Sequence, residues 1–176
     1  MTDSGTAAIA GLTPGTYRID PTQSQVHYSG KHMFGMGTVR ATFSIAGGEL
    51  RVGDTLASSR TVVTVDATSF SSNNARRDND VRSAGLLDVD RYPTITFESD
   101  SLRQAEDGWV APGSVTAHGH TVPVDVRIDR ATGEGAGIRL HGRAERLDRT
   151  AFGITGSRGM VGRYLNLELD VFATAV

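Results

Sequence analysis

Residues 115–128 read Val-Thr-Ala-His-Gly-His-Thr-Val-Pro-Val-Asp-Val-Arg-Ile, and this segment specifies the class of fold. Its apolar residues occupy odd positions before His118 and even positions after Gly119. A two-residue hairpin turn requires such a change of parity, because it places Ala117 opposite His120 on one face of a sheet. Histidine tolerates a positive φ better than most residues and glycine adopts it freely, so both suit the turn. The segment therefore predicts an antiparallel β-hairpin.

A second hairpin is expected at Gly47-Gly48, where the apolar parity changes in the same way. There Ile45 would face Leu50 across the turn. Alternation typical of strands also occupies residues 16–19, 25–29, 38–45, 49–52, 60–65, 94–99, 137–146 and 164–172. Together these segments predict about ten short antiparallel strands, joined by turns rich in Gly and Asp.

One polar segment, residues 71–85, breaks the strand pattern. It begins with Ser and Asn, which cap helices, ends on a glycine, and places Asp78 four positions before Arg82. These features predict a short helix from Asn74 to Ala84. Its sequence is too polar for the core, so we expect it across one end of a barrel. We also expect Arg82 to be partly buried and paired with an acid, either Asp78 or another.

An all-β chain of this kind fits either a closed barrel or a two-sheet sandwich, because the strands of both alternate in the same way. A barrel of about eight strands has an interior wide enough for one small ligand. Only six Phe and one Trp are available to fill such a centre, so a closed barrel should keep an apolar void. We expect the barrel domain to span residues 14–176, after a flexible tail of small and polar residues over 1–13.

The composition indicates an ordinary globular protein and excludes several classes of function. The 176 residues suit one domain, with 38% hydrophobic residues and a net charge of −2. The scattered basic residues form no footprint for nucleic acid, so no nucleic-acid partner is expected. The absence of cysteine excludes disulfides, thiolate nucleophiles and cysteine-ligated metals.

The chain carries no sign of a membrane span or of an export signal. No apolar run reaches the roughly 18 residues that a spanning helix needs, so no stable membrane insertion is expected. The first residues lack the basic and apolar regions of a secretory signal. This favours a cytoplasmic location over the alternative that a leader was removed.

Candidate sites for chemistry are few. His118 and His120 stand two apart, like the metal-binding pair that β-barrel enzymes place on one strand face, but the hairpin puts His118 in the turn and His120 on the inner face. We therefore expect no metal. No nucleophile elbow, phosphate loop or dinucleotide fingerprint is present, so no catalytic residue or cofactor is expected. The Gly-rich segment 152–163 could cradle an anion beside Arg158, but a loop at the barrel rim fits it better.

The arginines of the expected helix allow two interpretations. Arg76, Arg77 and Arg82 could form a solvated helix face, with Asp78 and Asp80 as partners. Alternatively, one or two of these arginines could close over the barrel mouth and bind an anionic headgroup. Composition alone does not separate the two.

Motifs along the chain from Gly15 to the C-terminus occur in the order of a known family. They are Gly15-Thr-Tyr-Arg-Ile-Asp-Pro21, Ser24-x-Val26 with Lys31-His32-Met33, Arg77-Asp78-x-x-Val81-Arg82-Ser83, Asp88-Val-Asp-Arg-Tyr-Pro-Thr-Ile-Thr-Phe97, His118-Gly119 with Pro123-Val124, and Arg149-x-x-Phe152-Gly153-Ile154. On these motifs the chain resembles the YceI-like family of lipid-binding proteins. It departs from the family at Gln23 and Asp80, where relatives often carry His, and at Ala151, where they often carry an acid.

The resemblance implies a lipocalin-like antiparallel barrel of about eight or more strands with a hydrophobic cavity. The implied function is non-enzymatic binding, transport or storage of a polyisoprenoid or similar long-chain amphiphile. A metal-assisted enzyme acting on such a lipid and a broad sequestering protein for lipophilic compounds stay open as alternatives, as does a homodimer. The expected ligand contacts are inward aromatic residues for the tail, Tyr28, Phe43, Phe97 and Phe152, and basic residues for the head, Lys31, His32, Arg77 or Arg82.

Overall fold

The protein is a closed antiparallel β-barrel in a computed structural model, which describes residues 12–176. Its strands are β1 (Gly15–Ile19), β2 (Gln25–His32), β3 (Gly37–Val52), β4 (Arg60–Ser71), β5 (Thr94–Ser99), β6 (Arg103–Ala105), β7 (Gly108–Ala117), β8 (His120–Glu134), β9 (Gly137–Asp148) and β10 (Val161–Ala175). The helix is α2 (Ala75–Arg82), and short 3-10 turns occupy η1 (Pro21–Gln23), η2 (Leu56–Ser58) and η3 (Arg149–Phe152).

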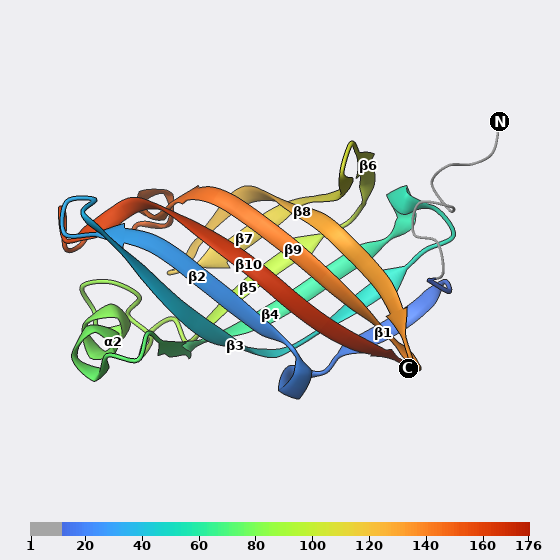
Figure 1. Ribbon diagram of the computed structural model, residues 1–176, viewed down its shortest axis with the longest axis horizontal. Helices are drawn as coiled ribbons and strands as arrows, with labels where there is room; N and C mark the ends of the chain where they lie inside the picture. Colours follow the sequence, from blue (N-terminus) through green and yellow to red (C-terminus); the bar gives the residue numbers. More distant parts are fainter. Residues whose placement is uncertain (1–11) are drawn as a thin grey trace.

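Eight of the strands form the ring of the barrel (Figure 1). Their order is β10-β2-β3-β4-β5-β7-β8-β9, and the pairing of β9 with β10 closes the ring. This confirms the antiparallel, lipocalin-like barrel and rejects the two-sheet sandwich. Several strands are longer than expected, and the longest are β3 with 16 residues and β8 and β10 with 15 each. A closed barrel accommodates such lengths because its strands are tilted to the axis.

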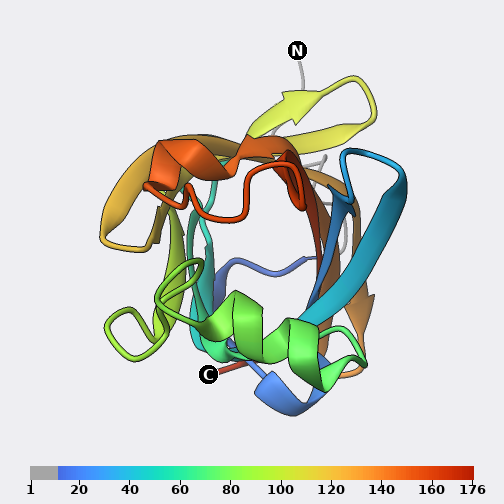
Figure 2. The same cartoon turned by 90° about the vertical axis from the view of Figure 1, so that its left-hand side faces the viewer.

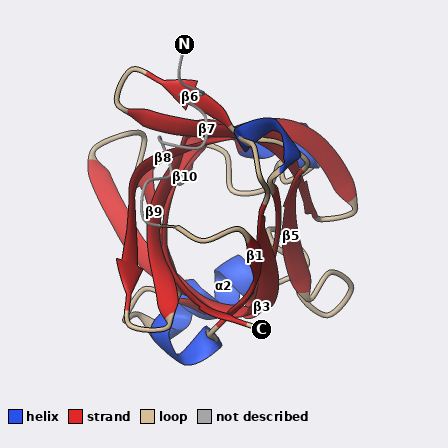
Figure 3. Ribbon diagram, turned by 90° about the vertical axis from the view of Figure 1, so that its right-hand side faces the viewer, coloured by secondary structure: helices blue, strands red, loops and turns tan. Residues whose placement is uncertain are grey.

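The two remaining strands lie outside the ring. β6 pairs with β7, while β1 pairs with both β10 and β3 at the end of the barrel farthest from α2 (Figure 3). The C-terminus lies at this same end. The tail predicted over 1–13 falls outside the described residues except for its last two, of which Leu12 packs against the core.

The predicted hairpin at residues 115–128 is confirmed. Ala117 pairs with His120, and the two turn residues both have positive φ, 52° at His118 and 74° at Gly119. One detail is wrong, because the side chain of His120 is exposed at the barrel rim instead of facing inward. Its Nδ1 atom lies 2.8 Å from the carbonyl oxygen of His118, so the ring folds back over the turn.

The predicted hairpin at Gly47-Gly48 is wrong. β3 runs straight through both glycines, which pair with β4, and the register slips between Ile45 and Gly47. Such a β-bulge adds one residue to one strand and therefore changes the apolar parity just as a turn does. The glycine at position 48 serves a close approach, since a Cβ there would lie 2.3 Å from the carbonyl oxygen of Val62.

The predicted helix is confirmed within one or two residues of its expected ends. α2 begins after Asn74, whose side-chain oxygen accepts a hydrogen bond from the backbone N–H of Arg77 at 3.0 Å. Figure 2 shows α2 along one edge of the mouth of the barrel, with the β2–β3 connection and the segment between β9 and β10 around the same opening. The helix therefore lies at a barrel end, as its polar sequence predicts.

The buried charge of α2 is a different residue from the one expected. Arg82 is only partly buried, and it donates to the carbonyl oxygen of Phe70 at 2.6 Å and to the side chain of Asn79 at 3.3 Å, so the expected acid partner is wrong. Asp78 is buried instead, and its carboxylate accepts two 3.0 Å hydrogen bonds from the backbone N–H of Ser72. The carboxylate turns toward the end of β4 because the unpaired N–H there needs an acceptor.

Candidate ligand-binding cavity

A cavity of about 370 Å³ opens at the α2 end of the barrel. Its volume falls within the usual range of small-molecule pockets. Most of its wall is apolar and comes from β2, β3, β4, β10 and the segments that follow α2 and η3: Val39, Phe43, Phe70, Leu86, Ile154 and Leu165. A void with such a wall favours an apolar ligand over water.

Aromatic rings form the floor of the cavity. Phe70 contacts Phe43 edge-on with ring centres 5.3 Å apart, and it contacts Tyr28 in the same manner at 5.6 Å. Gly30 makes room for the tyrosine, because a Cβ at that position would collide with the phenol. Burial raises the pKa of the Tyr28 phenol above its ordinary value, and the charge of Arg149 opposes part of that rise. The phenol is therefore a neutral hydrogen-bond donor at neutral pH.

Arg149 brings a buried positive charge to the cavity wall. The residue is only 5% exposed. Its guanidinium donates to the carbonyl oxygens of Gly162 (2.9 Å), Ile154 (2.9 Å) and Val161 (3.0 Å). Burial lowers the pKa of Arg149, while the neighbouring Tyr28 and Asp148 oppose this. Arginine nevertheless keeps its charge in proteins.

This guanidinium has neutral partners. The carbonyls take three of its five N–H donors, and the nearest acid in sequence, Asp148, is bound instead to Arg163 at 2.9 Å. The sequence places Arg149 in a family motif but indicates no contact between this residue and a ligand. Neither periodicity nor spacing indicates that an arginine after a strand turns inward.

The rim of the cavity carries further basic side chains. Lys31 at the end of β2 donates to the hydroxyl of Thr38 at 3.0 Å, and His32 follows it. Arg77 on α2 donates from Nε to the hydroxyl of Ser72 at 2.9 Å. Among the described residues that line the cavity, Asp80 is the one carboxylate. The mouth therefore has an excess of positive charge.

Five of the eight predicted ligand residues line this cavity, and the structure brings them together from β2, β3 and α2: Tyr28, Lys31, His32, Phe43 and Arg77. Phe97 and Phe152 lie in the buried core outside its wall, and Arg82 lies outside it as well. Alternation along a strand predicts which residues face inward. It carries no information on depth along the barrel axis, which the register of all the strands sets together.

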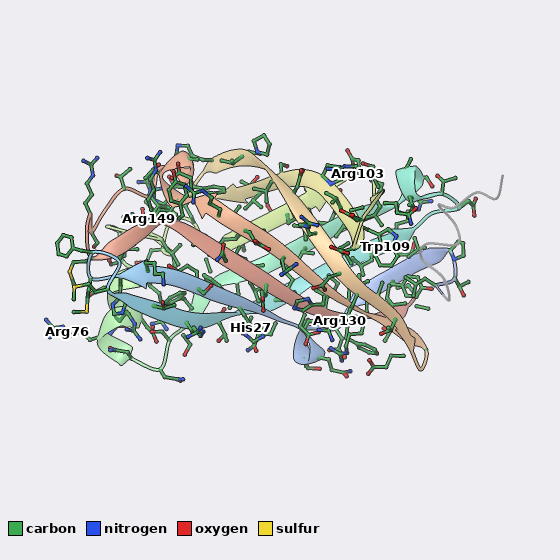
Figure 4. The ribbon with its side chains drawn as sticks, turned by 45° about the horizontal axis from the view of Figure 1, so that its top comes forward. His27, Arg76, Arg103, Trp109, Arg130 and Arg149 are labelled. Carbon is green, nitrogen blue, oxygen red and sulfur yellow. The ribbon has the colours of Figure 1, made fainter. Side chains whose placement is uncertain are left out.

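A larger hollow of about 900 Å³ lies on the outer face of β2, β3, β9 and β10. Polar and charged side chains line most of it, among them His27, Arg40 and Glu168. Figure 4 shows His27 on this outer side of the barrel. Because the hollow is open and polar, it is less suited than the inner cavity to remove an apolar tail from water.

Within residues 12–176, no three His, Asp or Glu side chains lie close enough to hold a metal ion together. No helix in this part of the chain is long and apolar enough to cross a membrane.

The family model described as YceI-like domain matches residues 17–173. The chain belongs to this family. A UPF0312 protein of Vibrio cholerae is 37% identical over 75 residues, which cover 42% of this chain and 40% of that protein. A UPF0312 protein of Yersinia pestis is 31% identical over 117 residues, which cover 62% of this chain and 59% of the relative. Both matches thus span only part of the relative.

Solved structures share the fold of this YceI-like chain. BcnA of Burkholderia cenocepacia aligns with a TM-score of 0.72 and 22% identity over 89% of this chain and 99% of its own. A polyisoprenoid-binding domain from Saccharophagus degradans aligns with a TM-score of 0.69 and 11% identity over 93% of this chain and 100% of its own. At these identities the likeness establishes a common fold.

Proposed function

We propose that the protein binds an amphiphilic lipid, with an isoprenoid or similar apolar tail in the cavity and an anionic head at its mouth, and that it carries or stores this lipid without chemical change. The observation that carries the proposal is Arg149, a buried cation on the wall of an apolar cavity that has no carboxylate partner within residues 12–176. The polyisoprenoid-binding neighbour of the same fold and the membership of the family support it.

The tail binds because the cavity wall removes it from water. Each buried CH₂ group contributes about 0.8 kcal/mol, and the aromatic floor at Phe43 and Phe70 sets how far the tail reaches. The apolar side chains around this floor exclude ligands that are polar along their length.

The head binds because the mouth is positive and incompletely paired. Arg149 has two N–H donors beyond those taken by carbonyl oxygens, and Arg77 and Lys31 stand at the rim. A carboxylate or phosphate head would satisfy these donors, and hydrogen bonds to charged groups contribute about 1.5–3 kcal/mol. The excess of positive charge favours anionic heads over neutral ones of equal chain length.

The proposal is tested with lipid pairs that share one chain, such as farnesol and farnesyl pyrophosphate, in a fluorescent-lipid displacement assay. Arg149→Met should lower the affinity for farnesyl pyrophosphate by about tenfold or more and leave the affinity for farnesol nearly unchanged. Arg103→Met is the matched control, because this exposed arginine lies toward the other end of the barrel (Figure 4). Because Arg149 also donates to three backbone carbonyls, its replacement could disturb the fold. Arg77→Ala removes a rim cation that makes fewer structural contacts, and it should also lower the affinity for the anionic ligand. Equal affinities of the wild type for both ligands would contradict the head assignment.

The tail is tested at Phe43, on the floor of the cavity. Phe43→Trp reduces the volume of the cavity and should lower the affinity for long-chain lipids more than for short-chain lipids. Phe43→Leu enlarges the cavity and should shift the preference toward long chains. Lipid extracted after incubation should have an unchanged mass. A chain-length preference that neither substitution alters, or a modified lipid, would contradict the proposal.

A further inference from the structure

Four exposed apolar side chains gather at the mouth of the cavity. Phe34 and Met36, in the β2–β3 connection, are 80% and 86% exposed, and Met33 and Met160 are about half exposed. The other five phenylalanines of the chain are all buried. We name these four residues the apolar tip. An exposed apolar cluster at one site, in a chain that buries its other phenylalanines, indicates an interaction surface.

The apolar tip is an ordered structure. The backbone N–H of Met33 donates to Met160 at 3.1 Å and that of Phe34 donates to Gly159 at 2.5 Å, so the β2–β3 connection is tied to the loop before β10. Met33 and Phe34 have φ of 51° and 57°, a region that side chains of this size seldom adopt. The backbone N–H of Gly35 donates to the carbonyl oxygen of His32 at 3.1 Å, so Met33 and Phe34 are the two central residues of the β2–β3 turn, and this turn holds both side chains at the end of the barrel.

The apolar tip adjoins the cavity and lies among cations. Met160 lines the cavity itself, next to Lys31 and His32. Figure 4 shows the methionine sulfurs, in yellow, at the same end of the molecule as Arg76. Arg158, exposed in the loop before β10, adds another positive charge. A second hollow at this end, of about 540 Å³, is lined by residues that include Phe34 and Arg158. Among the described residues that line this hollow and the cavity, the Lys and Arg side chains are Lys31, Arg77, Arg149, Arg158 and Arg163, and the one acid is Asp80, although the whole chain has a net charge of −2. Of these cations, Arg163 is paired with Asp148.

We propose that the apolar tip docks on an anionic phospholipid bilayer, so that the cavity opens onto the membrane and the bound lipid passes between the two. Phe and Met side chains flanked by Lys and Arg are the pattern by which proteins insert into the interfacial layer of a membrane without crossing it. The inference rests on the proposed function, because a lipid cargo is what requires a route between bilayer and cavity.

A lipid surface fits the shape of the apolar tip better than a protein does. A stable protein interface buries about 800 Å² on each partner, over a broad and complementary surface. The apolar tip is instead a small set of side chains that project from two loops, with cations beside it. A bilayer accepts such a shape because its headgroup layer is fluid, and its anionic lipids complement the charge.

The test is flotation of the purified full-length protein with phosphatidylcholine vesicles, with and without phosphatidylglycerol. The wild type should bind the anionic vesicles, and less so in high salt. The double variant Phe34→Ser/Met36→Ser should lose at least tenfold in affinity, because two apolar side chains no longer leave water. The control is Val62→Ser/Val176→Ser, which removes two exposed apolar side chains elsewhere. Arg158→Gln should cost about fivefold.

A second measurement locates the contact. The chain has one tryptophan, Trp109, which lies toward the opposite end of the barrel (Figure 4). Brominated lipids should quench a tryptophan introduced by Phe34→Trp and leave Trp109 of the wild type unquenched. The comparison of quenching at position 34 with quenching of Trp109 uses proteins that keep the apolar tip. It therefore stays informative even if the double variant folds poorly.

Absence of vesicle binding by the wild type would overturn the inference, and so would equal binding by the double variant or quenching of Trp109. A dimer in sedimentation that the double variant abolishes, without vesicle binding, would assign the apolar tip to a second copy of the chain instead. Displacement assays with soluble ligand keep the two proposals distinct, because neither Phe34 nor Met36 lines the cavity. Their variants should bind a dissolved lipid as the wild type does.

Discussion

At the scale of single residues, neighbours in sequence serve different sites. Asp148 accepts hydrogen bonds from the backbone of Thr150 at 2.9 Å and from Arg163 at 2.9 Å, and so holds the start of η3 to β10. Arg149, the next residue, turns inward and donates to carbonyl oxygens near the cavity. The two opposite charges therefore form no ion pair with each other, and two N–H donors of Arg149 are not taken by the carbonyl oxygens.

Acid should weaken the protein through Asp148. Hydrogen bonds from Arg163 and Thr150 lower the folded pKa of this carboxyl from 3.8 to about 2, so its ionised form stabilises the folded state. That contribution is fully present above the ordinary pKa and is lost as the pH falls through about 2. The difference in free energy of unfolding between the wild type and Asp148→Asn, from urea titrations, should be constant above about pH 5 and shrink toward zero near pH 2. A difference that does not change with pH would refute this.

At the scale of elements, the barrel depends on where strands bend as well as on where they pair. β3 carries its bulge near Gly47 and then continues along β4, while its last residues also pair with β1. α2 is attached to the end of β4 by Asp78, which accepts from Ser72, and Arg77 donates to the same serine hydroxyl. The helix that bounds the cavity is therefore anchored by a buried polar network.

The bulge predicts that alanine substitutions at the two adjacent glycines have different effects on stability. At Gly48, a Cβ would lie 2.3 Å from the carbonyl oxygen of Val62 and 2.8 Å from Ile19, so Gly48→Ala should destabilise the protein by about 2 kcal/mol or more. At Gly47, a Cβ would meet no other atom within 4 Å, so Gly47→Ala should change stability by less than about 1 kcal/mol. Urea unfolding measures both. If both substitutions lowered the free energy of unfolding equally, the result would favour a turn at these glycines and contradict the bulge.

At the scale of the whole molecule, the barrel is packed along most of its length and hollow at one mouth. The core holds residues from every strand of the ring, and the cavity lies above the aromatic floor at the α2 end. The excess of basic residues and the apolar tip lie at this same end. One end therefore combines the features that a lipid carrier needs.

A bound lipid should stabilise the entire barrel. A ligand that binds only the folded state adds about 2.7 kcal/mol at a concentration of about 100 times its Kd. For a chain of this length that corresponds to a rise in Tm of roughly 5–10 °C. Differential scanning fluorimetry should record this rise with an isoprenoid acid and little change with equimolar zinc. A comparable rise with zinc, abolished by His120→Ala, would instead support a metal-assisted enzyme.

Features that depend on local chemistry could be predicted from the amino-acid sequence. Parity and turn residues specified the hairpin at His118-Gly119, because a two-residue turn leaves no other register. Cap residues specified α2, because the first N–H groups of a helix need an acceptor such as Asn74. The strand pattern specified an all-β fold, and the inward aromatic residues of β2 and β3 followed from it.

Features that depend on several strands at once became apparent in the folded barrel alone. A bulge and a turn change parity alike, so the course of β3 past Gly48 required its partner strands. Depth along the axis separated Phe43, on the cavity floor, from Phe97, in the packed core, because the stagger of the closed ring sets that depth. The unpaired charge of Arg149 arose in the same way. Two of its three carbonyl partners, Val161 and Gly162, lie 12 and 13 residues away at the start of β10, beyond the reach of a local pattern.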